Sequence, residues 1–204
     1  MSAISIFDML KIGVGPSSSH TFGPWKAAND FIELLKTQNA FNRVQEVKVQ
    51  LFGSLALTGV GHGTDIAIML GLSGAMAETI PLEHVTEIPE HIQLMHQLNL
   101  NNTRIIDFHP QQHIIFNFSK RLPFHSNGLQ FEAYDEAKQL LVKQAYYSLG
   151  GGFISRGEQV LDVSRTPPPY HCLNARSLFQ HCVSARISIS ELALCNERQW
   201  GEEQ

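Results

Sequence analysis

A segment rich in glycine and serine, residues 13–21, most constrains how this chain can fold, because it leads directly into a run with helical periodicity. Two glycines and a proline set its path, since glycine reaches backbone angles closed to other residues and proline locks its own φ. The hydroxyls that follow, from Ser17, Ser18, Ser19 and Thr21, can cap the next helix. The open N–H groups of that helix would face the loop, which suits an anion such as a carboxylate.

A second glycine-rich segment, residues 59–63, has the same plan as the first. It precedes a strongly apolar run over residues 64–70, and it carries His62 near the start of that run, as the first segment carries His20. A histidine at a helix N-terminus tends to stay neutral and can then accept a proton or donate a hydrogen bond. For either loop alone, an ordinary capped helix with a surface histidine remains the alternative. Two matching loops favour a shared functional site.

Hydrophobic periodicity predicts the other elements. Helices are expected over residues 4–10, 22–35, 64–70, 91–98, 173–183 and 189–197, and strands over residues 47–51, 104–108, 114–118, 129–134, 141–149 and 160–163. Pro24 falls in the first turn of its helix, where a missing N–H costs nothing. Thr64 or Asp65 is expected to cap the helix that begins there.

Turn signals divide the second half of the chain. Residues 109–112 (His-Pro-Gln-Gln) are expected as a turn between two strands, and Asn127-Gly128 as an exposed hairpin tip. Because Pro110 opposes a helix, His109 and His113 are not expected to align on one. His91 and His96 are expected at the surface, because their spacing is poor for a shared ligand.

This order of elements predicts an α+β domain over residues 1–165, a mixed sheet with helices mainly on one face and an α-β-α-β-β-β-like core. The strands at 47–51 and 104–108 can pair in parallel, whereas later hairpins should be antiparallel. Residues 166–170, Thr-Pro-Pro-Pro-Tyr, are expected to form a stiff linker. The two helices of residues 171–204 are too short to build their own core and should pack on a further domain.

Composition excludes several classes of protein. The 204 residues carry 15 basic and 19 acidic side chains without a basic cluster, so neither nucleic acid nor an anionic membrane is an expected partner. The N-terminus has no signal-peptide pattern and no stretch is long and apolar enough to span a membrane, so we expect a cytoplasmic protein. Cys172, Cys182 and Cys195 show no CxxC spacing, so they are not expected to bind a metal cluster.

Three blocks of the sequence resemble one known family. Residues 12–21 (IGVGPSSSHT) with Gly23-Pro24, residues 53–65 (GSLALTGVGHGTD) and residues 147–153 (YSLGGGF) are similar to motifs of the iron–sulfur-dependent L-serine dehydratases, also called L-serine deaminases. The resemblance runs from about residue 4 to residue 197, with the blocks in family order. It departs in one respect, because the family's cluster-binding cysteines lie in a catalytic domain downstream of this region.

The resemblance implies an activity in the complete enzyme, the dehydration of L-serine to pyruvate and ammonia. There a [4Fe–4S] cluster with an open iron would act as a Lewis acid and a base would remove the α-proton. This chain would supply no metal ligand. It would supply catalytic histidines and groups that bind the substrate: His20, His62 and His125, with Ser17, Ser18, Ser19, Thr21, Gly61, Thr64 and Asp65.

The resemblance leaves open which histidine is the base. His62 has a glycine on each side, so it gives substrate the closest access. His125 belongs to a third segment, where the family has His-Pro-Asn and this chain has Ser126 in place of proline. The expected partners are L-serine, a catalytic iron–sulfur domain or subunit, and further copies of the chain in a homo-oligomer.

Two other classes of function are weighed against this one. Domains similar to this chain occur in some phosphoglycerate dehydrogenases, where they bind effectors without catalysis, so a regulatory domain that binds serine or a similar small anion is the main alternative. A histidine-based metal enzyme is disfavoured, because no HExxH or comparable spacing is present.

Overall fold

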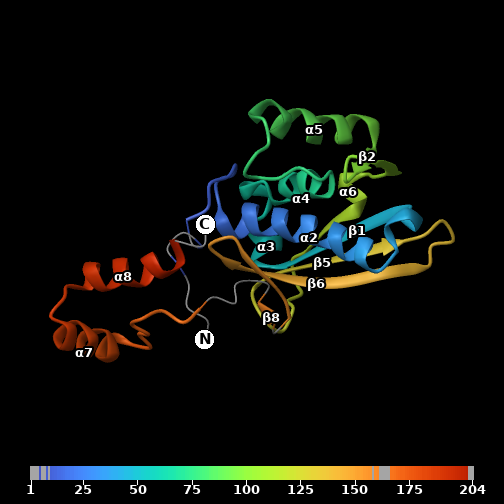
Figure 1. Ribbon diagram of the computed structural model, residues 1–204. Coiled ribbons are helices and arrows are strands. Elements are labelled where there is room, and N and C mark those ends of the chain that lie inside the picture. Colours follow the sequence, from blue (N-terminus) through green and yellow to red (C-terminus); the bar gives the residue numbers. More distant parts are fainter. Residues whose placement is uncertain (1–4, 6–7, 9, 158, 161–165, 202–204) are drawn as a thin grey trace. The chain divides into compact units, whose positions relative to one another are not determined.

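The computed structural model describes residues 5, 8, 10–157, 159–160 and 166–201. The chain divides into two compact units, one of residues 11–161 and one that joins residues 1–10 to residues 162–204 (Figure 1). The larger unit contains both histidine loops. The domain boundaries expected from the sequence stay predictions.

The larger unit alternates helices and strands. Its elements are η1 Ser18–Phe22, α2 Gly23–Thr37, η2 Phe41–Arg43, β1 Glu46–Gly53, α3 Ser54–Thr58, η3 Val60–His62, α4 Thr64–Leu72, α5 Leu82–Met95, β2 Gln97–Leu100, β3 Arg104–Asp107, α6 Pro110–His113, β4 Ile114–Asn117, β5 Asn127–Tyr134, β6 Leu140–Gly150, β7 Phe153–Arg156 and β8 Gln159–Val160. No helix among the described residues is long and apolar enough to cross a membrane.

A mixed sheet with strand order β4-β1-β5-β6-β7-β8 forms the framework of this unit. The β1–β4 pair is parallel and the remaining pairs are antiparallel, with Val49 of β1 opposite Ile114 of β4 and Phe131 of β5. Helix α2 packs against β5, β6 and β7, and α3 against β1 (Figure 1). The predicted α+β fold is confirmed.

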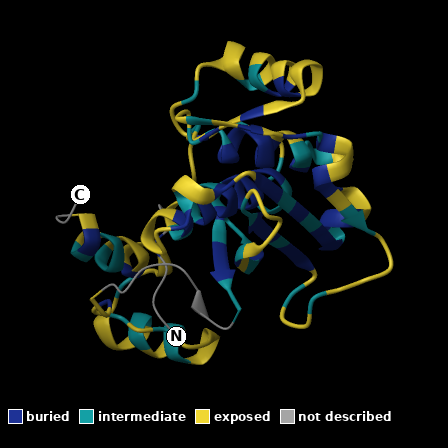
Figure 2. Ribbon diagram, turned by 90° about the vertical axis from the view of Figure 1, so that its right-hand side faces the viewer, coloured by how far each residue is buried: buried dark blue, intermediate teal, exposed yellow. Residues whose placement is uncertain are grey.

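The core lies between α2 and the sheet. Val47, Val49 and Leu51 alternate along β1 and are fully buried, as the strand periodicity predicts. Figure 2 shows the buried residues in dark blue on the inner helices and strands. Phe31 of α2 stacks on Phe131 of β5, with 5.0 Å between the ring centroids. Each such side chain contributes about 1.5–3 kcal/mol by leaving water, so the position of β1 beneath α2 is strongly determined.

The pairing of the strand after residue 104 was predicted wrongly. This strand, β3, pairs antiparallel with β2 in a separate two-stranded sheet, and β4 is the parallel partner of β1. Asn101 and Asn102 join β2 to β3 with φ of 50° and 54°. Two consecutive residues with positive φ match the tight hairpin turn that asparagine tolerates, so the local turn determines the pairing of β3.

Two predicted turns are also replaced by regular structure. The 109–112 segment contains α6, because proline is tolerated in the first turn of a helix. Asn127 and Gly128 are buried and begin β5, so the expected exposed hairpin tip is wrong. A Cβ on Gly128 would lie 3.0 Å from Leu122, so Leu122 packs closely against this segment.

Helix α5 differs from its prediction in both bounds. It begins at Leu82, contains Pro89 and ends at Met95, whereas a helix over 91–98 was expected. Pro89 and Ile92 are its buried residues, so the helix packs through the turn that contains the proline. His91 and His96 are exposed, as predicted.

The smaller unit contains α7 Ala175–Ala185 and α8 Ile189–Gly201, which confirms its two predicted helices. Asn174 caps α7 by accepting a hydrogen bond from the Ser177 N–H. The helix predicted over residues 4–10 lies mostly outside the described residues. The strand predicted over residues 160–163 is described only at its first residue, as part of β8.

Candidate functional site

The two glycine-rich loops meet in the folded chain. The rings of His20 in η1 and His62 at the end of η3 lie 4.9 Å apart between centroids and are tilted by 38°. Both side chains are partly accessible to solvent. The matching patterns in the sequence therefore correspond to a contact in space.

Two threonines connect the loops by reciprocal hydrogen bonds. The Thr21 hydroxyl donates to the backbone carbonyl of His62 at 2.7 Å, and the Thr64 hydroxyl donates to the carbonyl of His20 at 2.5 Å. Both threonines are buried. The predicted cap of α4 by Thr64 or Asp65 is wrong: Gly63, in the left-handed region at φ 63°, is the N-cap, and no side chain caps it.

The backbone orients the ring of His62. Its Nδ1 lies 2.8 Å from the carbonyl oxygen of Thr58. Because a carbonyl can only accept, Nδ1 must carry the proton. When the ring is neutral, Nε2 then keeps a free lone pair and is available to accept a proton.

The ring of His20 lies between two serine hydroxyls. Ser19 Oγ is 2.9 Å from Nδ1, and Ser54 Oγ is 3.0 Å from Nε2. A hydroxyl both donates and accepts, so either tautomer is satisfied. Burial, and then the neighbouring His62, lower the pKa of His20 below its ordinary value, while a hydrogen bond with the backbone of Ser54 opposes them. His20 is therefore held in its neutral form near neutral pH.

Ser54 is a site residue that sequence reasoning missed. It is the first residue of α3 and follows β1 directly through Gly53, whose φ is 55°. A Cβ at Gly53 would lie 2.3 Å from the Ser126 carbonyl oxygen, so glycine is required there both for its φ and for this close approach. The sequence could have indicated Ser54, since Gly53 and Ser54 both belong to the second block that resembles the family, residues 53–65.

The other predicted binding residues lie around the pair with varied roles. Ser17 caps η1, where its hydroxyl accepts from the N–H of His20 at 3.1 Å. Ser18 and Gly61 are exposed, and a side chain at Gly61 would meet nothing within 4 Å. Asp65 lies in the first turn of α4 and is half-buried. Ser18 and Gly61 therefore leave open space beside the rings.

The segment of His125 contacts this site through its backbone. The Ser126 carbonyl accepts from the N–H of Ser54 at 2.9 Å. His125 Nδ1 accepts from the N–H of Asn127 at 3.1 Å, so in the neutral ring Nε2 carries the proton. His125 and His62 therefore present opposite tautomers, one a donor at Nε2 and the other an acceptor.

The third family-like block supports the first. Ser148 in β6 is fully buried, and its carbonyl accepts from the Asn127 side chain at 3.1 Å. A Cβ at Gly23, at the start of α2, would lie 2.0 Å from Ser148 Oγ. The third block, residues 147–153, therefore packs directly against the start of α2.

Apolar side chains are exposed on η3, which carries His62, and on the two helices before and after it, α3 and α4. Leu57 of α3 is 58% exposed, Val60 of η3 is 70% exposed and Ile66 of α4 is 38% exposed. An exposed apolar group beside open polar groups is typical of a surface that another protein covers.

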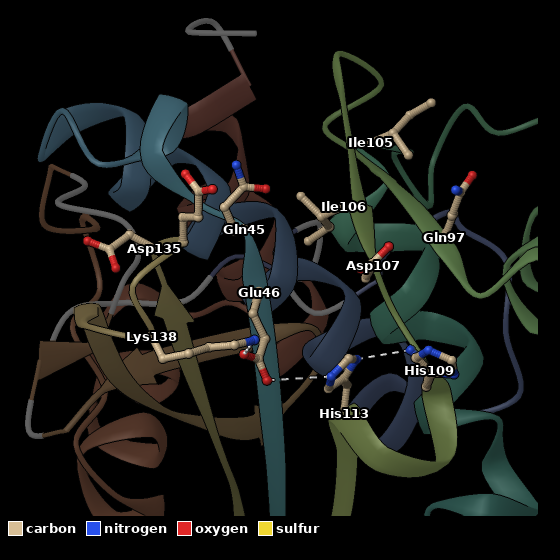
Figure 3. A pocket seen from close by; sticks show the side chains of 11 residues that line it. Gln45, Glu46, Gln97, Ile105, Ile106, Asp107, His109, His113, Asp135 and Lys138 are labelled. Carbon is tan, nitrogen blue, oxygen red and sulfur yellow. Dashed lines mark hydrogen bonds and ion pairs between the residues drawn. The ribbon is translucent and has the colours of Figure 1, made fainter.

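A second group of titratable residues lines a pocket of about 570 Å³ at the opposite end of β1 (Figure 3). His113 Nε2 is 3.5 Å from Glu46 Oε1, Lys48 Nζ is 2.9 Å from the same oxygen, and Lys138 Nζ is 2.5 Å from Oε2. The N–H of His109 donates to His113 Nδ1 at 2.9 Å. The prediction that Pro110 opposes a helix here is wrong, because Pro110 begins α6; His109 lies outside that helix as its N-cap, so the two histidines do not share a helix, as expected.

Within this second group, Glu46 has Lys48, Lys138 and His113 as partners. Burial alone would raise the pKa of Glu46, but hydrogen bonds from Lys138 and Lys48 outweigh it and lower the pKa below its ordinary value. Burial lowers the pKa of His113, and the charge of Glu46 opposes this shift. The pocket also contains Asp107, Asp135 and Glu136, so it carries an acidic excess and does not suit an anion.

The described residues contain no group of three or more His, Cys, Asp or Glu side chains that could hold a metal ion. Cys172, Cys182 and Cys195 are free thiols on separate segments of the smaller unit. Neighbouring Cys182 and, more strongly, burial raise the pKa of the Cys172 thiol. These cysteines do not fit a [4Fe–4S] cluster, which needs three or four converging thiolates.

Comparison with known proteins identifies the family. The family model for the serine dehydratase beta chain matches residues 5–159, which contain every site residue described above. The chain belongs to the serine dehydratase beta-chain family. The resemblance stated from the three sequence blocks is thereby confirmed.

Individual relatives agree with this assignment. The chain is 38% identical over 199 residues to an L-serine dehydratase of Haemophilus influenzae, and 40% identical over 201 residues to L-serine dehydratase TdcG of Escherichia coli. Each alignment covers 95% of this chain and 43% of the relative. A Streptomyces coelicolor L-serine dehydratase is 37% identical, with 45% of its length covered. The beta-chain-like sequence thus spans less than half of the curated relatives it matches.

Proposed function

We propose that this chain is the part of an L-serine dehydratase that binds the substrate carboxylate and transfers the α-proton, in a site completed by a catalytic part of the enzyme. L-Serine loses its α-proton and its β-hydroxyl as water, and the resulting 2-aminoacrylate hydrolyses through its imine to pyruvate and ammonia. The observation that supports this proposal best is the contact of the His20 and His62 rings in an open site within a serine dehydratase beta-chain domain.

His62 is the proposed base. The hydrogen bond from its Nδ1 to the Thr58 carbonyl leaves Nε2 as the proton acceptor, and the exposed Gly61 beside it leaves space for substrate. A base positioned in this way contributes about 10²–10⁴-fold to a rate. After it takes the α-proton, the same Thr58 carbonyl stabilises the imidazolium, because both ring nitrogens then donate.

His20 and its two serine partners are proposed to bind and polarise the substrate. A neutral His20 can donate to a carboxylate from one nitrogen while the other accepts from Ser19 or Ser54. The accessible Ser18 and the Nε2 donor of His125 add further polar groups. The roles of the ten residues named from the sequence stay predictions at this stage.

The iron–sulfur cluster implied by the family would be bound elsewhere in the complete enzyme. Since the described cysteines do not converge, we assign no cluster ligand to this chain and derive no step through the cluster. The exposed Leu57, Val60 and Ile66 are proposed to contact the catalytic part, whether it is a domain or a separate subunit. A homo-oligomer of the complete enzyme remains part of this proposal.

A chimera tests the proposal directly. This chain would replace the matching region of the Haemophilus influenzae L-serine dehydratase, and pyruvate formation from L-serine would be followed under anaerobic conditions. We expect the chimera to be active and this chain alone, after incubation with iron and sulfide, to be inactive and free of a stoichiometric cluster. Serine turnover by this chain alone would contradict the proposal, as would an inactive but folded, cluster-loaded chimera.

A regulatory domain that binds serine or another small anion is the alternative function. The pocket at the start of β1 is one region of the larger unit that is separate from the histidine pair and large enough for a small molecule. Its acidic excess disfavours an anion there. Calorimetry with L-serine on this chain distinguishes the two: binding that survives His62→Asn but is lost in Lys138→Ala would favour the regulatory function.

A further inference from the structure

The described residues place two buried threonines between the histidine loops, and neither hydroxyl points to the open site. Thr21, next to His20 in sequence, donates to the carbonyl of His62, and Thr64, two residues after His62, donates to the carbonyl of His20. Each loop is therefore held by a side chain of the other. We call these two hydrogen bonds the threonine brace.

We propose that Thr21 and Thr64 are positioning residues, which hold the rings of His20 and His62 at the separation that the reaction uses. This inference rests on the proposed function for its kinetic consequence, but its geometric part does not. It changes the role expected from the sequence, where both threonines were candidates for binding the substrate.

The packing of the loops explains why a brace is needed. η1 is a single π-helical turn and η3 a single 3-10 turn, and neither is long enough to be rigid by its own backbone hydrogen bonds. The brace ties the carbonyl of each histidine, so it acts one bond away from the Cα that carries each ring. A displacement of about 1 Å at reacting groups can lower a rate about 100-fold.

Burial makes both hydrogen bonds costly to lose. Thr64 is fully buried and Thr21 is 5% exposed, so water cannot replace either donor without rearrangement. Removal of one hydroxyl leaves a histidine carbonyl without that donor, and the loop is expected to shift until the carbonyl finds another. A shift of the loop moves the ring.

The test replaces each threonine by valine, which keeps the shape, and by serine, which keeps the hydroxyl. The direct readout is the nuclear Overhauser effect between ring protons of His20 and His62 in this chain, labelled selectively at histidine. We expect Thr21→Val and Thr64→Val each to lose the inter-ring signal, and both serine variants to keep it. Thr37→Val is the matched control, since its hydroxyl also donates to a backbone carbonyl, that of Glu33 at 2.8 Å.

The kinetic readout uses the chimera. We expect each valine variant to lower kcat about 10- to 100-fold, with the serine variants within about threefold of the parent and the control unchanged. If one valine variant does not fold, the other tests the same brace from the opposite loop. Valine variants that keep both the inter-ring signal and kcat would overturn the inference. Loss of the ring signal in a chimera that never turns over serine would instead contradict the proposed function and leave the brace supported.

Discussion

The two ends of β1 carry two groups of histidines that differ in how their partners are used. At the start of the strand, Glu46 is contacted by Lys48, Lys138 and His113, so its carboxylate has opposite charge beside it. At the far end, Ser54 contacts His20, and among the described residues the two histidine rings contact hydroxyls, one carbonyl and each other. A carboxylate that already accepts several hydrogen bonds stabilises a fold, whereas a histidine with one free nitrogen is available for chemistry.

The largest expected effect contrasts one histidine from each end. His62→Asn in the chimera should lower kcat about 10²–10⁴-fold, because a positioned base is lost. His113→Asn should leave kcat within about threefold, because its ring contacts Glu46 and not the open site. Steady-state kinetics with L-serine measures both. Equal losses in the two variants would remove the distinction between the two groups.

The reverse contrast concerns stability. Glu46→Gln should lower the free energy of unfolding by about 1–2 kcal/mol, the usual effect of weakening buried charged hydrogen bonds, while kcat of the chimera stays near that of the parent. Glu33→Gln is the control, because its ion pair with Lys36 is largely exposed and should contribute less than about 0.5 kcal/mol. Urea denaturation measures both. A Glu46 variant as stable as the control would show that the group at the start of β1 is not structural.

A smaller effect tests the influence of His62 on the pKa of His20. Because neighbouring His62 lowers the pKa of His20, His62→Asn should raise that pKa. Histidine ring resonances followed by NMR against pH report the shift. Ser73→Ala, whose hydroxyl donates to the Met69 carbonyl away from the pair, should leave it unchanged. A fall of the His20 pKa in His62→Asn would contradict the geometry of the site.

The smallest expected effect is on how the stability of the fold depends on pH, to which a histidine at each end of β1 contributes. The pKa values of His20 and His113 are both lowered on folding, mainly by burial. The unfolded chain therefore takes up protons first as the pH falls below about 6.5, and stability decreases from there down through the folded pKa values. Above that pH both rings are neutral in either state and stability should be flat. His113→Asn should reduce the slope, and urea midpoints between pH 5 and 8 would measure it.

Local periodicity predicted the parts of the fold that bury a single apolar face. The helix after the serine loop and the strand from Val47 were found within two or three residues, because their side chains face one core. The pairing of β3 and the helix α6 were missed, since each depends on a turn: Asn101-Asn102 with positive φ, and Pro110 in a first helical turn. The prediction treated Pro110 as if it lay inside a helix, where proline breaks the structure, whereas it lies in the first turn.

The sequence predicted the site residues that lie in two loops of matching pattern. It did not predict contacts between side chains that are far apart along the chain. His20 and His62 were named together because two loops share a plan, and they lie 4.9 Å apart. Ser54 was missed because its contact with His20 depends on the turn at Gly53 and on the packing of two separate loops. Thr21 and Thr64 were assigned to substrate because a hydroxyl in a motif says nothing of its partner, and in the fold that partner is a backbone carbonyl.

The tautomer of His62 is the measurement that tests the account most directly, because the proposed base requires a free Nε2. Imidazole ¹⁵N chemical shifts of this chain distinguish a protonated ring nitrogen from an unprotonated one. The Thr58 carbonyl at 2.8 Å predicts that Nδ1 of His62 is protonated and Nε2 is not. His125 is the internal reference, since the N–H of Asn127 predicts the opposite tautomer. A neutral His62 with its proton on Nε2 would contradict the account.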